Sequence, residues 1–192
     1  MANQAYDSYR QMMALGIAPD WLTDTIEAVL VSSSYTPNYA TDASLSNLGA
    51  NVVGSAVQLA GIAVSNGQVT ANATTFPAVA SGSTVDYIAI YKNTGAATAW
   101  AASTAYSAGT VIQDSNGNLQ KCVTAGTSGS AAPTWNTTYN GATTDGTVSW
   151  LNIGPNNPLM VLFDSASGSP GLPVTSNGGD IDVTWGSPLF QP

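Results

Sequence analysis

The chain has 192 residues, of which only 7% are charged, and its formal net charge at pH 7 is −8. Its three basic residues are too few for the positive patch that neutralises nucleic-acid phosphates. It has no histidine, which excludes imidazole-based nucleophile systems and removes the usual imidazole metal ligands. The composition therefore argues against nucleic-acid binding and against most hydrolase mechanisms.

The low charge also indicates where such a chain functions. Ordinary soluble domains have roughly 25% charged residues, which keep them soluble and protect their β edges. No segment approaches ~18 consecutive apolar residues, and no basic region precedes an apolar run at the N-terminus, so neither a membrane span nor a signal peptide is predicted. Cys122 is the only cysteine and is expected to be a small buried hydrophobe. We expect a cytosolically made chain that functions inside an assembly.

The first predicted element is a helix ahead of Gly16. Apolar and aromatic residues recur there at spacings of three and four, from Tyr6 to Leu15. A β-branched run over 24–31 then predicts a strand, which ends in a loop of Ser, Tyr and Pro. Residues 39–49 fit either an extended loop or a single helical turn.

Further strands follow in the pattern of a meander. Weak alternation over 52–64 precedes Asn66-Gly67, the composition of a tight hairpin turn. Residues 85–91 form the clearest strand, residues 158–164 read as its hairpin partner, and residues 180–185 read as the last strand. Short strands separated by Gly and Pro predict an all-β fold, mainly an antiparallel β-sandwich with a short N-terminal helix.

A separate module interrupts this pattern after the strand over 85–91. Three of the five tryptophans lie between Trp100 and Asn152. Within this stretch, two short apolar strands flank Asn116-Gly117, and residues 146–151 form a closing strand. We therefore predict a discontinuous host domain over 1–97 and 155–192, with a small three-stranded β module inserted over 98–154.

Four aromatic residues of the insert are candidates for sugar binding: Trp100, Tyr106, Trp135 and Trp150. Sugar rings stack on flat indole surfaces, but a module of this size also needs large rings to fill its core. Trp100 and Tyr106 fit the strand pattern and are expected in the core. Trp135 follows Pro133 in a loop and is expected to be the exposed ring.

Other polar patterns favour structural roles. Asp180 and Asp182 share one face of a strand and could form a carboxylate pair, but a Gly-Gly turn before them favours two solvated side chains. Asp114, Asn116 and Asn118 faintly resemble a calcium loop whose bidentate Glu is missing, so a hairpin turn is the better interpretation. No catalytic residue, metal site or cofactor is predicted.

The insert resembles a known class of small modules. Its order of Trp100, Tyr106 and Gly109, then 116–122, then Pro133-Thr-Trp135 and 145–150 resembles small β modules of bacteriophage tail-fibre and head proteins. Those modules are similar to chitin-binding modules of carbohydrate-binding family 5/12. The resemblance covers residues 100–152 and implies polysaccharide recognition.

The host domain resembles a family of small structural proteins of tailed phages. The similarity lies in residues 20–31, 33–37, 88–95 and 178–185. In that family the strand ending in Tyr-Lys-x-Thr-Gly runs almost directly into the next strand, so this chain departs by carrying the insert at that turn. The resemblance implies a virion protein, associated with capsid decoration.

Together these patterns predict a decoration or cement protein on the outer capsid surface, made in the cytoplasm of a bacterial host. It would bind the lattice of the major capsid protein as a closed homo-oligomer, with a trimer as the first expectation. The alternative is a tail-fibre or tail-tip protein that recognises host surface polysaccharide through the insert. A secreted bacterial carbohydrate-binding module is a third hypothesis, weakened by the missing signal peptide.

Overall fold

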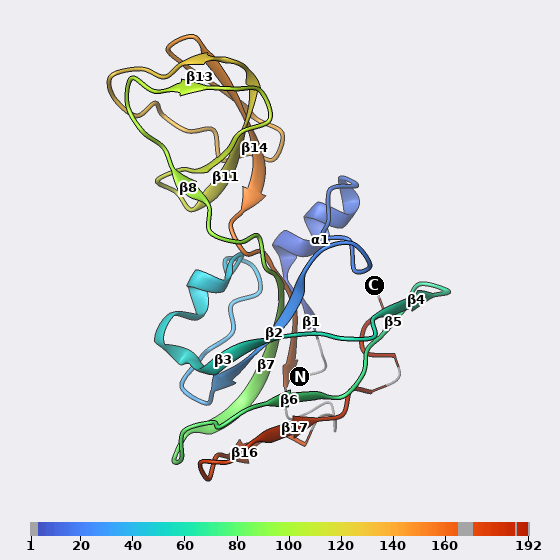
Figure 1. The fold of residues 1–192 in the computed structure, drawn as a ribbon. Coiled ribbons are helices and arrows are strands. Elements are labelled where there is room, and N and C mark those ends of the chain that lie inside the picture. Colours follow the sequence, from blue (N-terminus) through green and yellow to red (C-terminus); the bar gives the residue numbers. More distant parts are fainter. Residues whose placement is uncertain (1–3, 165–170, 187, 192) are drawn as a thin grey trace. The chain divides into compact units, whose positions relative to one another are not determined.

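The structure is a computed structural model that describes residues 4–164, 171–186 and 188–191 (Figure 1). In this part of the chain, strands dominate and the only α-helix is short and N-terminal, which confirms the predicted all-β class. The chain divides into unit 1, Met1–Asn93 with Asn157–Pro192, and unit 2, Thr94–Asn156. The sequence-based limits of the insert, 98 and 154, lie slightly inside those of unit 2.

Unit 1 is built on one antiparallel sheet in the order β1-β15-β7-β2-β3, with β16 paired to β7. Its strands are β1 (Gln4–Ala5), β2 (Ile26–Ser32), β3 (Val52–Gln58), β7 (Thr84–Lys92), β15 (Leu159–Asp164) and β16 (Val174–Thr175). The central pair places Val29 opposite Ala89. β7 and β15 are antiparallel neighbours with Leu159 opposite Tyr91, which confirms the hairpin pairing predicted across the insert.

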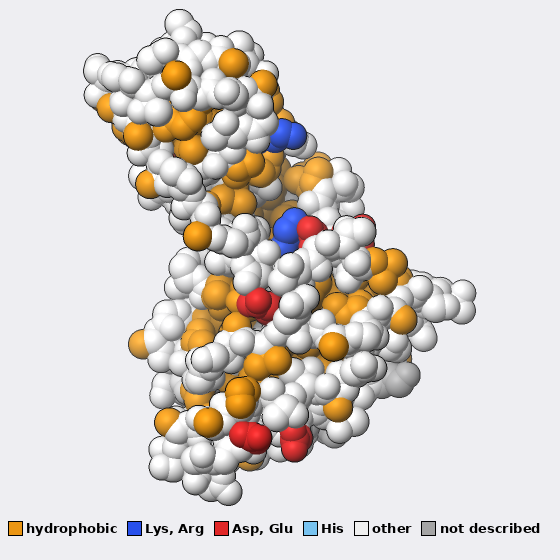
Figure 2. Space-filling model, viewed as in Figure 1, with side chains coloured by type: hydrophobic (Ala, Val, Ile, Leu, Met, Phe, Trp, Pro, Cys, Tyr) orange, Lys and Arg blue, Asp and Glu red, His pale blue; other side chains and the backbone are white. Residues whose placement is uncertain are grey.

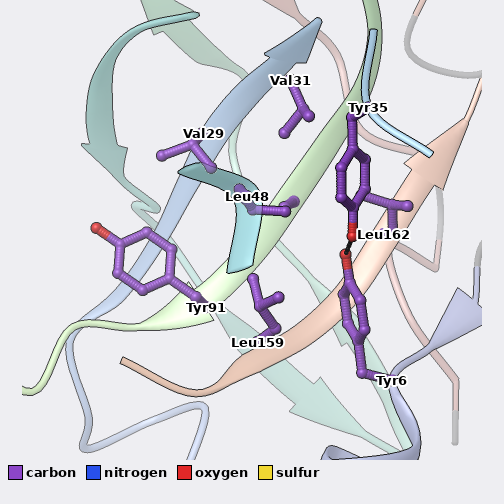
Figure 3. Packing of buried hydrophobic residues seen from close by; sticks show 9 residues of the cluster. Tyr6, Val29, Val31, Tyr35, Leu48, Tyr91, Leu159 and Leu162 are labelled. Atoms are coloured by element: carbon purple, nitrogen blue, oxygen red, sulfur yellow. Dashed lines mark hydrogen bonds between the residues drawn. The ribbon is translucent and has the colours of Figure 1, made fainter. Parts of the chain in front are cut away.

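Both faces of this sheet are covered, which explains why its central strands read as continuous apolar runs. On one face, side chains from β2, β7 and β15 pack against Tyr6, which follows β1, and against Tyr35 and Leu48, which lie between β2 and β3 (Figure 3). On β15, Phe163 packs against Trp185 with ring centroids 5.4 Å apart. The core of unit 1 therefore lies on both sides of β2, β7 and β15.

Smaller elements complete unit 1. They are helix α1 (Asp7–Ala14), a 3₁₀ segment (Leu45–Asn51), the hairpin of β4 (Ala63–Ser65) with β5 (Gln68–Thr70), and the antiparallel pair of β6 (Thr74–Phe76) with β17 (Ile181–Val183). The segment over 39–49, which the sequence left open, contains the start of the 3₁₀ turn. The last predicted strand is β17, which pairs with β6 rather than with the main sheet.

Unit 2 contains more strands than the three predicted. Its sheet has five strands in the order β13-β14-β11-β10-β8, and a separate ladder joins β9 to β12. The strands are β8 (Thr98–Ala99), β9 (Ala105–Tyr106), β10 (Val111–Gln113), β11 (Asn118–Thr124), β12 (Gly126–Thr127), β13 (Ala142–Asp145) and β14 (Val148–Pro155). The additional strands are short and polar, so they lack the apolar alternation that identifies a strand in sequence.

Two turns form where the Asn-Gly pairs predict them. Asn66 and Gly67 have φ angles of 51° and 75°, and they connect β4 to β5. Gly117 has φ of 81° between β10 and β11. Positive φ at both Asn66 and Gly67 matches the right-handed twist of the flanking strands in a hairpin, whereas in the second turn only Gly117 has positive φ.

Candidate functional site

The four aromatic candidates lie together in unit 2, but as a core rather than as a platform. Trp150 is fully buried, and Trp135 is 6% exposed. Both belong to a cluster with Ile112, Cys122 and Val148, against which the half-buried Trp100 and Tyr106 pack. The burial of Cys122 is as predicted from its apolar neighbours.

The geometry of the rings differs from that of a sugar-stacking surface. The Trp135 and Trp150 rings meet at 69° and the Tyr106 and Trp150 rings at 73°, both edge-to-face. This arrangement stabilises a small core, whereas a platform needs roughly coplanar exposed faces. The expectation that Trp135 is the exposed ring is wrong. Although Trp135 follows Pro133 in a loop, its ring packs inside the hydrophobic cluster of this small module.

A buried carboxylate organises these rings. Asp145 is 3% exposed, and its Oδ2 accepts hydrogen bonds from the indole nitrogens of Trp100 at 2.7 Å and Trp150 at 3.2 Å. Its Oδ1 accepts the backbone N–H of Gly129 at 2.7 Å. Charge-assisted hydrogen bonds of this kind are about twice as strong as neutral ones, so Asp145 fixes the orientation of two rings and a loop.

A surface pocket of about 220 Å³ lies beside this core. It is lined by Ala99, Trp100, Gln113, Asp114, Ser115, Ala132 and Trp135. Two of the four aromatic candidates therefore border one concave site, whereas Tyr106 and Trp150 do not. The pocket is smaller than the ~300–1,000 Å³ of sites for drug-sized ligands, so it fits only a small group.

Asp114 is the charged residue of this pocket, and it also forms the β10–β11 turn. Its Oδ1 accepts the backbone N–H groups of Asn116 at 2.8 Å and Asn118 at 2.9 Å. Its Oδ2 accepts Gln120 Nε2 at 2.8 Å. These contacts agree with the prediction of a hairpin turn, because the Asp114 side chain accepts hydrogen bonds from backbone N–H groups of its own turn.

Sequence reasoning missed a buried amide network next to Asp114. Gln120 and Asn152 are fully buried, and Asn152 Nδ2 donates to the carbonyl oxygen of Asn136 at 2.7 Å. Gln120 Oε1 has no hydrogen-bond partner. The strand register of β11 and β14, which places Gln120 opposite Asn152, brings these amides together, and one sequence gives no sign of that pairing.

The other carboxylate pair considered from sequence is structural. Asp182 Oδ1 accepts the Thr75 hydroxyl at 2.5 Å across the β6–β17 ladder. Asp180 Oδ1 accepts the backbone N–H of Ala78 at 2.8 Å, where Ala78 has φ of 47°. Both carboxylates thus hold the β17 region to the β6 region of unit 1.

A tyrosine network occupies the core of unit 1. The hydroxyl oxygens of Tyr6 and Tyr35 lie 3.3 Å apart (Figure 3). Tyr35 also donates a hydrogen bond to Asp42 Oδ2 at 2.6 Å. Burial raises the pKa of both tyrosines, and the neighbouring hydroxyl and carboxylate raise it further in Tyr6. Burial also raises the pKa of Tyr39 to about 12. These hydroxyls connect the N-terminal segment to the loop after β2.

No known protein family, curated protein or solved structure matches the chain. Within the described residues, no helix is long and apolar enough to cross a membrane. Over the same residues, no group of three His, Cys, Asp or Glu side chains converges on a candidate metal site. The function must therefore be inferred from the chemistry of the two units.

Proposed function

We propose that the chain is a structural protein of a tailed-phage virion, and specifically a capsid decoration protein that binds and stabilises the head shell. The observation that carries this proposal is the neutral surface. Only 14 of 192 residues are charged, 3 basic and 11 acidic. Figure 2 shows a face on which charged side chains are few among neutral polar and hydrophobic ones. A surface of this kind suits permanent burial between subunits.

Unit 1 would provide the contacts with the lattice of the major capsid protein and with its own copies. Its sheet ends at β3, whose side chains are mostly exposed and carry no charge. Edge strands without charge are prone to pairing with other chains, which is useful in a protein that assembles. A closed homo-oligomer, with a trimer as the specific expectation, would bridge neighbouring capsid subunits, and its binding would stabilise the assembled shell by mass action.

Unit 2 would be displayed on the outside of the shell. It enters the chain at the β7–β15 connection, where Lys92 donates its backbone N–H to the carbonyl oxygen of Pro158 at 3.1 Å. The host strands therefore close into a hairpin around the insertion point. Insertions at such turns are tolerated because they leave the strand ladder intact, so a module can be added there without change to the lattice contacts of unit 1.

The alternative, a tail-fibre or tail-tip protein that recognises host polysaccharide, is less well supported. It requires aromatic faces exposed for stacking, and Trp135 and Trp150 are buried in the core of unit 2. We also propose no enzymatic activity and no cofactor, because Asp114, Asp180 and Asp182 serve as hydrogen-bond acceptors in turns and ladders.

Location within purified virions tests the proposal. Antibodies raised against unit 2 would be imaged on the particles by electron microscopy, together with a count of copies per particle. Label over the whole head at high copy number is expected. Label confined to the tail tip at a few copies would refute decoration and favour the polysaccharide-binding alternative.

A control antibody against unit 1 separates position from accessibility. If unit 1 faces the lattice, this antibody should label intact heads weakly and dissociated protein strongly. Sedimentation of the purified protein measures the oligomeric state, and a trimer is expected.

A further inference from the structure

The pocket of unit 2 combines features that proposed capsid binding does not use. The residues that line it are two tryptophans, one aspartate, one glutamine, one serine and two alanines. Trp100 is half-buried and packs against the core cluster, and Trp135 is a member of that cluster; both border the pocket. The pocket is thus both aromatic and acidic.

The charge of Asp114 has no cationic partner in the described structure. The ion pairs found there join Arg10 to Asp7 and Lys92 to Asp24, all in unit 1. Lys121 is the only basic residue of unit 2, and it is exposed on β11. It follows Gln120, which faces Asp114, so Lys121 lies on the opposite face of the strand. The Asp114 carboxylate is 6% exposed and accepts hydrogen bonds from its own turn and from Gln120, but it forms no ion pair within the described residues.

We infer that this pocket binds a small organic ammonium group, held between the Trp100 and Trp135 indoles and the Asp114 carboxylate. Cations within about 6 Å of an indole centroid are attracted by its π face, and the attraction grows as water is excluded. A carboxylate beside the indoles adds a Coulombic attraction that a neutral ligand does not experience. The small volume of the pocket suits an alkylammonium group such as that of choline, either free or as a headgroup.

Gln120 offers a way to remove the charge without breaking the turn. In an Asp114→Asn variant, Asn Oδ1 can still accept the backbone N–H groups of Asn116 and Asn118. The new amide nitrogen would meet Gln120 Nε2, but a flip of the Gln120 amide presents Oε1, which now has no partner. The variant is therefore expected to fold like the parent protein and to lack only the charge.

The inference is tested by nuclear magnetic resonance of the indole N–H groups in the full chain, titrated with choline chloride against sodium chloride at equal ionic strength. The Trp100 signal is assigned by its loss in Trp100→Phe. We expect saturable shifts for Trp100 and Trp135, with a dissociation constant on the order of 1 mM. The signals of Trp21 and Trp185, which donate to Tyr9 and Thr74 in unit 1, should stay unchanged.

Variants and a neutral analogue decide whether charge is recognised. Asp114→Asn should weaken choline binding about tenfold or more, and Asp180→Asn, which removes one negative charge from unit 1, should not. Ser115→Lys places an ammonium group at the exposed rim and should also abolish binding. The analogue of choline in which carbon replaces nitrogen should not bind. Equal binding of that analogue, or unchanged binding by Asp114→Asn, would overturn the inference.

Two further ligands identify the source of the ammonium group and the competing class of ligand. Binding to phosphatidylcholine vesicles as well as to free choline supports the inference with a lipid headgroup as the source. Binding to free choline but not to the vesicles also supports the inference, and it identifies the source as a soluble or polymer-linked cation. Shifts with N-acetylglucosamine oligomers but none with choline would overturn it in favour of a sugar site. None of these results depends on where the chain lies in a virion.

Discussion

The indole nitrogen of Trp100 donates a 2.7 Å hydrogen bond to Asp145 Oδ2, although 45 residues separate them in sequence. The same oxygen accepts Trp150, which is fully buried at the centre of unit 2. One carboxylate therefore joins the first strand region of unit 2 to its last two strands. Because Asp145 accepts hydrogen bonds from three groups in distant segments, we expect its removal to destabilise unit 2.

Asp145→Ala should destabilise unit 2 by about 2–4 kcal/mol, because it leaves the Trp150 and Gly129 donors without an acceptor in a buried site. Hydrogen exchange of the β11 and β14 amides measures this loss, since it reports on unit 2 separately from unit 1. The matched control is Asp182→Ala on β17 of unit 1, where Asp182 is exposed, and this variant should leave β11 and β14 unaffected. Equal protection in Asp145→Ala and the parent protein would contradict the role of Asp145.

Trp135→Ala should cost about 3–5 kcal/mol of unit 2 stability, because a large buried ring is replaced by a cavity. This is the opposite of what an exposed sugar-binding ring would show. Hydrogen exchange of the β11 and β14 amides provides the measurement, because it reports on unit 2 separately from unit 1. Val123→Ala is a suitable control, since Val123 is 47% exposed and should change stability by less than about 0.5 kcal/mol. A small effect of Trp135→Ala would place that ring outside the core.

Replacement of Thr94–Asn156 by a two-residue Asn-Gly turn should leave unit 1 folded. β7 and β15 are already paired beside the insertion point, with Leu159 opposite Tyr91, and Asn-Gly favours the tight hairpin turn. Amide spectra of the shortened chain should superimpose on the unit 1 signals of the full chain. An unfolded or aggregated product would show that unit 2 contributes to the core of unit 1.

Alkaline pH should destabilise unit 1 through its buried tyrosines. Burial raises the pKa of Tyr6 and Tyr35, and it raises that of Tyr39 to about 12, above the value of about 10 for an unfolded chain. Their contribution to stability is therefore complete below about pH 10 and is lost as the pH rises from about 10 towards the folded pKa values.

Urea midpoints measured from about pH 8 to about pH 11 should fall only above pH 10. Tyr39→Phe removes one of the ionising groups and should lose less stability over this interval than the parent protein. The same fall in both proteins would assign the alkaline loss to groups other than Tyr39.

The sequence alone determined the features that depend on local pattern. The helix before Gly16, the strands β7 and β15, and the Asn-Gly turns at Gly67 and Gly117 follow from apolar spacing and from glycine's access to positive φ. Composition alone argues against nucleic-acid binding, because there are three basic residues, and against imidazole-based catalysis, because there is no histidine. These features can be predicted from sequence because they depend on neighbouring residues or on the number of residues of each type.

Only the tertiary structure decided which aromatic residues are core and which border a pocket. Trp135 lies in a loop by sequence, yet it packs edge-to-face on Trp150, because burial depends on contacts between distant segments. The position of Asp145 beneath two indoles, and of Gln120 against Asp114, follows from the way the strands of unit 2 pair and fold over one another. A single sequence carries no direct signal of these strand pairings, so it does not predict the pocket between Trp100, Asp114 and Trp135.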